Sequence, residues 1–136
     1  MNNITWKYSS KLIKETVIEE FEKEMNISLP HDLKECFKKN NGGMPSKNIF
    51  DTDKTKGRMF NNLLSFNLNK DEDTIYDIYS AVYLKLKNKD VIPFALDPFG
   101  NILCLKEGKI VLFLHETGGT EFITDSFSEL LEKLYD

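Results

Sequence analysis

Cysteine is scarce in this chain of 136 residues, which holds only Cys36 and Cys104. A chain of this length can bury a core without disulfides. Both cysteines lie among apolar residues and the sequence shows no export signal, so we expect two buried free thiols in preference to a disulfide. The histidines His31 and His115 are equally isolated, and no cysteine or histidine has the spacing of a zinc site. We therefore expect no metal ion and no other cofactor.

Long hydrophobic runs are also missing. No apolar stretch approaches the ~20 residues that a membrane-spanning helix requires. The first 12 residues lack the apolar segment of a signal peptide. These absences predict a cytoplasmic protein that does not bind a membrane. A net charge of −4 argues against direct binding of nucleic acid.

The negative charge belongs to one half of the chain. Residues 1–68 hold 11 lysines and arginines against 9 acids, a balance of +2, whereas residues 69–136 hold 7 against 13, a balance of −6. Such an excess is either ordinary solvated surface or an acidic face directed at a basic partner. The length and the 40% hydrophobic content suffice for one domain with its own core, spanning residues 1–136.

Three short apolar runs at residues 91–95, 102–105 and 110–114 predict strands. Each of the two gaps between them contains glycine, and the first also contains Asp97 and Pro98, so both gaps are typical of tight turns. The stretch therefore predicts a three-stranded antiparallel meander. A short strand after residue 120 is expected to follow it.

Amphipathic spacing predicts four helices, at residues 9–25, 30–40, 74–88 and 126–134. Ser9 or Ser10 is expected to cap the first, Asp73 or Thr74 the third, and Asp125 or Ser126 the last. The acids of the first helix are interpreted as solubilising residues, with Glu19 and Lys23 as a favourable i, i+4 pair. The polar sequence of residues 44–57 indicates a mobile loop with a short strand near 48–50, and residues 59–66 are expected to form a further strand. The order of these helices and strands predicts an α+β domain, with helices packed on a mainly antiparallel sheet around a central β-meander.

Evidence for catalysis is thin. His115, at the end of a strand beside Glu116, is the best candidate for a catalytic base, with Asp97 as a conceivable partner across the meander. Adjacent residues of a strand face opposite sides, and Asp97 is also a common turn residue. We therefore predict no catalytic residue and no enzyme, with a small hydrolase using His115 as the remote alternative.

Four motifs in a fixed order carry a family resemblance. They are Ile27-Ser28-Leu29-Pro30 after an acidic helix, Asn41-Gly42-Gly43 after the next helix, Ile92-Pro93-Phe94-Ala95-Leu96-Asp97 with Gly100-Asn101, and Asp125-Ser126-Phe127 leading into the last helix. Over residues 17–134 the chain resembles the SUKH superfamily, which includes the yeast Smi and Knr regulators of cell-wall synthesis. The matching residues are read as fold residues, so the resemblance transfers no functional site.

The resemblance implies a single domain without catalytic machinery. Bacterial members look like immunity proteins of polymorphic toxin systems, which bind a cognate toxin domain, often a nuclease, and block it. We therefore expect a protein partner, most simply a toxin domain with a basic surface. The alternative is a regulatory interaction module of the Smi/Knr type.

The densest acidic group in the second half is the candidate contact surface. It consists of Asp71, Glu72, Asp73 and Asp77, with Tyr76 among them as an aromatic anchor. Carboxylates placed there would attract the basic surface of a nuclease. The simpler interpretation is that these acids only stabilise the start of a helix. Residues 44–58 match the family least and are the other place where specificity could lie.

Overall fold

A five-stranded antiparallel sheet carries the fold in the computed structural model, which describes residues 2–68 and 71–136. Its strands in spatial order are β5 (Asn62–Leu63), β6 (Val91–Leu96), β7 (Ile102–Lys106), β8 (Lys109–Phe113) and β9 (Thr120–Thr124). The predicted meander is thus confirmed as β6, β7 and β8. The sheet is wider than the meander because β5 and β9 pair with its two edges.

Two small antiparallel pairs stand beside this sheet. One joins β1 (Trp6–Lys7) to β2 (Met44–Pro45), and the other joins β3 (Ile49–Phe50) to β4 (Arg58–Met59). The short strand expected near residues 48–50 is therefore present. The single strand predicted at residues 59–66 is instead divided between β4 and β5.

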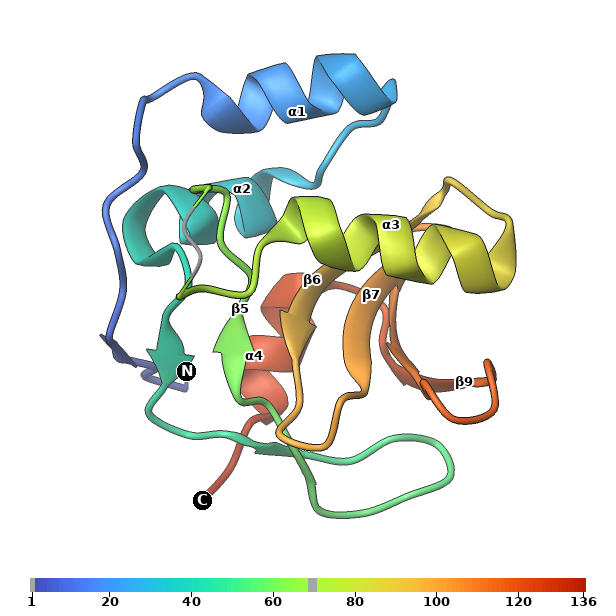
Figure 1. Ribbon diagram of the computed structural model, residues 1–136. Coiled ribbons are helices and arrows are strands. Elements are labelled where there is room, and N and C mark those ends of the chain that lie inside the picture. Colours follow the sequence, from blue (N-terminus) through green and yellow to red (C-terminus); the bar gives the residue numbers. More distant parts are fainter. Residues whose placement is uncertain (1, 69–70) are drawn as a thin grey trace.

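The described residues form four helices: α1 (Val17–Met25), α2 (His31–Asn40), α3 (Ile75–Leu86) and α4 (Phe127–Lys133). Figure 1 shows α3 lying across β6 and β7, with α4 on the opposite side of the sheet. The alternation of the strands explains the two apolar layers. On β7, Leu103 and Leu105 join the larger core cluster, whereas Ile102 and Cys104 join the smaller cluster that includes Val82 of α3. The predicted α+β fold is confirmed.

The first helix begins at Val17 and not near Ser10, so the predicted start is wrong. Tertiary hydrogen bonds hold the preceding segment in an extended path. The amide of Ser10 donates to the carbonyl of Asn41 at 2.9 Å, and the amide of Ile13 donates to Oδ1 of Asn67 at 2.8 Å. These bonds satisfy the backbone without a helix, which removes the advantage of continuing α1 towards the N-terminus.

The predicted caps of α3 and α4 are confirmed. The Thr74 hydroxyl accepts a hydrogen bond from the amide of Asp77 at 3.3 Å, and the Ser126 hydroxyl accepts one from the amide of Glu129 at 3.1 Å. The predicted polar lead into α3 included residues 69 and 70, which lie outside the described part of the chain.

Residues 51–57, expected to be mobile, are held against the edge strand β9. The amide of Asp53 donates to the carbonyl of Phe122 at 2.9 Å, and the Asp53 carboxylate accepts from the amide of Phe122 at 3.0 Å. Glu121, only 7% exposed, accepts hydrogen bonds from the hydroxyls of Thr52 and Thr55 at 2.8 and 3.2 Å. The loop thus covers backbone groups that an edge strand would otherwise expose.

None of the helices formed by the described residues is both long enough and apolar enough to cross a membrane.

Candidate functional site

The acidic residues singled out in the sequence surround the start of α3. Asp71, Asp73 and Asp77 are exposed, whereas Glu72 is partly buried. Among the residues that the structure describes, no lysine or arginine forms an ion pair with Asp73 or Asp77. The structure therefore brings these acids to one surface and leaves at least two of their carboxylates available to solvent.

Glu72 has a different position from the other three acids. Its Oε1 accepts a hydrogen bond from the hydroxyl of Ser10 at 2.8 Å. Its Oε2 is buried and has no hydrogen-bond partner within the described ranges. An unsatisfied buried carboxylate oxygen is uncommon in folded proteins. Glu72 therefore fastens the N-terminal segment beside Asp71 and Asp73, which line the same hollow.

A buried asparagine explains why the N-terminal segment lies beside this surface. Asn41 is fully buried, and its side-chain oxygen accepts from the amide of Phe66 at 2.9 Å. Its amide nitrogen donates to the hydroxyl of Ser65 at 3.0 Å, while its carbonyl accepts from the amide of Ser10. The side chain and the backbone carbonyl of this one residue after α2 thus join segments that are more than 50 residues apart in sequence.

Tyr76 lies at this surface but is also a core residue. Its hydroxyl donates to the carbonyl of Phe66 at 2.8 Å, and its ring packs edge-to-face on Phe21 with centroids 5.8 Å apart. Burial, and secondarily the nearby Glu24 and Glu20 carboxylates, raise the pKa of its hydroxyl. The polar tip of Tyr76 is therefore already engaged within the domain, which the sequence did not indicate.

A second tyrosine, which sequence reasoning missed, stands at the same surface. Tyr8 is 81% exposed and lies in the left-handed region with φ +61°, an uncommon conformation for a bulky residue. It lines a hollow of about 260 Å³ together with Met44, Asp71, Glu72 and Asp73. No local pattern in the sequence reveals this, because Tyr8 reaches the acids only through the tertiary bonds of Ser10 and Asn41.

The conceivable catalytic pair does not form a hydrogen bond. The Asp97 carboxylate accepts three hydrogen bonds from its own turn: from the amides of Phe99 and Asn101, both at 2.8 Å, and from the Asn101 side chain at 2.9 Å. The exposed ring of His115 lies against Gly100, where an added Cβ would stand 3.2 Å from Nε2. With φ +91° at Gly100 as well, glycine is required there. Asp97 thus has the turn role that its sequence context favours.

The two thiols are buried and free, as predicted. Burial raises the pKa of the Cys36 thiol to about 12, and burial also raises the pKa of the Cys104 thiol. A thiolate is the reactive form of cysteine, so neither residue is suited to nucleophilic catalysis at neutral pH. In the part of the chain that the structure describes, no three histidine, cysteine or acidic residues form a group that could hold a metal ion.

Comparison with known proteins places the chain in a family. The model of the SMI1 / KNR4 family (SUKH-1) matches residues 12–133, which is most of the chain. No curated protein sequence matches it significantly. Among solved structures, the crystal structure of a protein from Pseudomonas syringae pv. tomato is similar, with a TM-score of 0.54 and 14% identity over 84% of this chain and 77% of the other. That likeness concerns the fold alone. Together with the observed α+β architecture, the family match shows that this chain is a SUKH-domain protein of the SMI1 / KNR4 family.

Proposed function

We propose that this chain is a non-enzymatic protein-binding domain, and specifically a cytoplasmic immunity protein that neutralises a cognate toxin by direct binding. The observation that supports this most is the exposed acidic surface at the start of α3, formed by Asp71, Asp73 and Asp77 over the partly buried Glu72. The family match supports the choice of a protein partner over a small-molecule substrate.

Charge explains why a nuclease toxin suits this surface. A nuclease presents lysine and arginine to the phosphates of its substrate. Carboxylates on an inhibitor attract the same residues, which raises the association rate and covers the substrate site. The acids at the start of α3 also favour the helix N-terminus, but that effect is only ~0.3–1 kcal/mol for each exposed carboxylate.

An aromatic contact completes the proposed surface. Tyrosine is enriched among residues that dominate binding energy, because it offers a large rigid contact area and a polar tip. Tyr8 is 81% exposed beside the acids, whereas the hydroxyl of Tyr76 is bonded to Phe66. We therefore assign the main aromatic contact to Tyr8, with the exposed part of the Tyr76 ring beside it.

Co-expression tests the proposal directly. The chain is produced in bacteria together with the toxin domain encoded beside its gene, and growth is compared with that of cells producing the toxin alone. We expect growth to be restored and the purified pair to form a stable complex. Failure of rescue with well-folded protein would refute the immunity role for that pair. If the two proteins form a complex but the co-expressed domain alone is not toxic to cells, the regulatory module of the Smi/Knr type is favoured.

The hydrolase alternative has its own test. His115→Ala removes the best candidate base while its ring lies exposed, so the fold should survive. We expect unchanged rescue and unchanged affinity for the toxin. A variant that folds and binds normally but no longer protects cells would show that His115 acts catalytically.

A further inference from the structure

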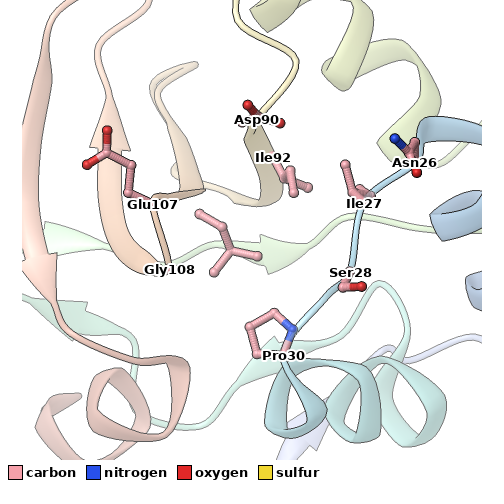
Figure 2. Close-up of a pocket in the computed structure, with 9 residues that line it drawn as sticks. Asn26, Ile27, Ser28, Pro30, Asp90, Ile92, Glu107 and Gly108 are labelled. Carbon is pink, nitrogen blue, oxygen red and sulfur yellow. The ribbon is translucent and has the colours of Figure 1, made fainter.

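A second hollow, of about 400 Å³, lies between the α1–α2 linker and the ends of β6 and β7. Figure 2 shows Ile27 and Pro30 on the linker side and Ile92 on the strand side, with Asp90 and Glu107 at its margin. Leu105 completes the apolar lining. The hollow therefore combines an apolar floor with acidic side chains at its opening.

The strand register explains how the two acids come to border the same hollow. Val91 pairs with Lys106 and Ile92 pairs with Leu105. Asp90 immediately precedes β6 and Glu107 immediately follows β7, so both acids lie at the end of the sheet where these two strands pair.

The turn that carries Glu107 has an unusual residue for its backbone conformation. Lys106 pairs with Lys109, which leaves a two-residue hairpin loop of Glu107 and Gly108. Both have positive φ, +53° and +79°, and a loop of this kind strongly favours asparagine or aspartate before glycine. Glutamate is therefore an unfavourable residue for the left-handed backbone conformation at position 107. Compared with aspartate, it places a longer acidic side chain beside the hollow.

The carboxylates at the opening are not held by close contacts within the domain. Among the described residues, no side chain forms a hydrogen bond or ion pair with the carboxylate of Asp90 or Glu107. Lys109 pairs with Asp125 at 2.8 Å, and Glu107 acts on Lys109 only through its charge. Both carboxylates at the opening therefore keep their hydrogen-bond acceptors for an incoming cation.

We infer that this hollow receives an arginine or lysine side chain of a protein partner. A long aliphatic stem fits the floor of Ile27, Ile92 and Leu105, and a cationic head then meets Asp90 and Glu107 at the margin. The two carboxylates attract the cationic head and can accept hydrogen bonds from it. This inference is independent of whether the partner is a toxin.

The probe is Nα-acetyl-L-arginine amide, and its neutral counterpart is Nα-acetyl-L-citrulline amide, which has nearly the same shape. Each is titrated into isotopically labelled protein while amide chemical shifts are followed by NMR. We expect the arginine compound to produce saturable shifts at Ile92, Leu105, Glu107 and Gly108 with a dissociation constant on the order of 1–10 mM. The citrulline compound should bind at least about fivefold more weakly than the arginine compound.

Two variants connect the result to the acids. Asparagine suits the hairpin loop better than glutamate, so Glu107→Asn should raise the urea midpoint of unfolding. The same variant should lower the affinity for the arginine compound about fivefold. Asp90→Asn should lower that affinity to a similar extent without raising the midpoint. Equal shifts from both compounds, shifts confined to other residues, or unchanged affinity in both variants would overturn the inference. Tight binding of calcium chloride at the same amides, with no response to arginine, would also overturn it.

Discussion

Two acidic regions look alike in the sequence and have opposite roles in the structure. On α1, each of three glutamates has a lysine partner: Glu19 with Lys38 at 3.3 Å, Glu20 with Lys14 at 3.0 Å, and Glu22 with Lys34 at 2.8 Å. At the start of α3, neither Asp73 nor Asp77 forms an ion pair with any described residue. The number of acids in a stretch therefore says little about what they do.

Packing of α1 against α2 explains the difference. Lys34 and Lys38 stand one helical turn apart on α2, and they reach Glu22 and Glu19 across the helical hairpin. The expected pair of Glu19 with Lys23 is replaced by this contact between helices. Both glutamates thereby fix how the two helices lie against each other. At the start of α3, no described lysine or arginine pairs with Asp73 or Asp77, so both carboxylates stay exposed to solvent.

Replacing Glu22 should have the largest effect on stability. Its second oxygen accepts a hydrogen bond from the amide of Leu29 at 2.7 Å, and its side chain is only 14% exposed. Glu22→Ala leaves both that amide and Lys34 without a partner, and we expect a loss of about 2 kcal/mol in the free energy of unfolding. Urea denaturation of both proteins measures this change in the free energy of unfolding.

Asp73→Ala is the matched control for Glu22→Ala. Asp73 is exposed and precedes the cap residue Thr74, so we expect a change within about 0.5 kcal/mol. Equal losses in the two variants would mean that the acids of the two regions do not differ in structural role.

Charge reversal at α3 should have the next largest effect, on binding and not on folding. In the triple variant Asp71→Lys, Asp73→Lys, Asp77→Lys, we expect the association rate with a cognate toxin domain to fall about tenfold. We also expect its dependence on salt concentration to weaken. Stopped-flow fluorescence at several salt concentrations measures both. Glu72 is left intact because its bond to Ser10 is structural.

The control reverses three exposed acids elsewhere, Glu15, Glu116 and Asp136, and changes the net charge by the same amount. Glu19, Glu20 and Glu22 are unsuitable controls because they are paired. If both triple variants associate equally slowly, only the net charge matters. If both associate as fast as the original protein, the acidic surface at α3 is not the contact, and residues 44–58 become the place to examine.

The smallest expected effect concerns a paired acid on β9. Burial by itself would raise the pKa of Glu121, but hydrogen bonds from Thr52 and Thr55 and the charge of Arg58 outweigh it, so the pKa lies below its ordinary value of 4.5. A carboxylate with a lowered pKa in the folded state stabilises the fold above its unfolded pKa, and this contribution disappears as the pH falls through the folded value.

Glu121→Gln should therefore cost about 1 kcal/mol at pH 7 and progressively less below about pH 4.5. Urea midpoints measured from pH 7 down to pH 3 give the comparison. A gap between the two proteins that stays constant over this range would show that the charge of Glu121 does not hold the loop of residues 51–57 on β9.

Sequence reasoning was most accurate where local chemistry decides the structure. The glycine-containing gaps around β7 predicted the meander, since tight turns leave few alternatives for the strands on either side. The caps Thr74 and Ser126 were predicted because a hydroxyl before an apolar helical face satisfies the free amides of the first turn. It was least accurate near Ser10, where bonds to Asn41 and Glu72 prevent a helix that the local pattern favours.

By itself, the sequence determined the α+β class, the order of the helices and the central strands, and the two buried thiols, because these follow from apolar periodicity, turn residues and caps. Only the tertiary structure decided which charges are available. Lysines from α2 neutralise Glu19 and Glu22, whereas distant bonds bring Tyr8 to the acids of α3. The physical reason is that ion pairs and shared surfaces depend on positions in space, and residues tens of positions apart meet only after the chain has folded.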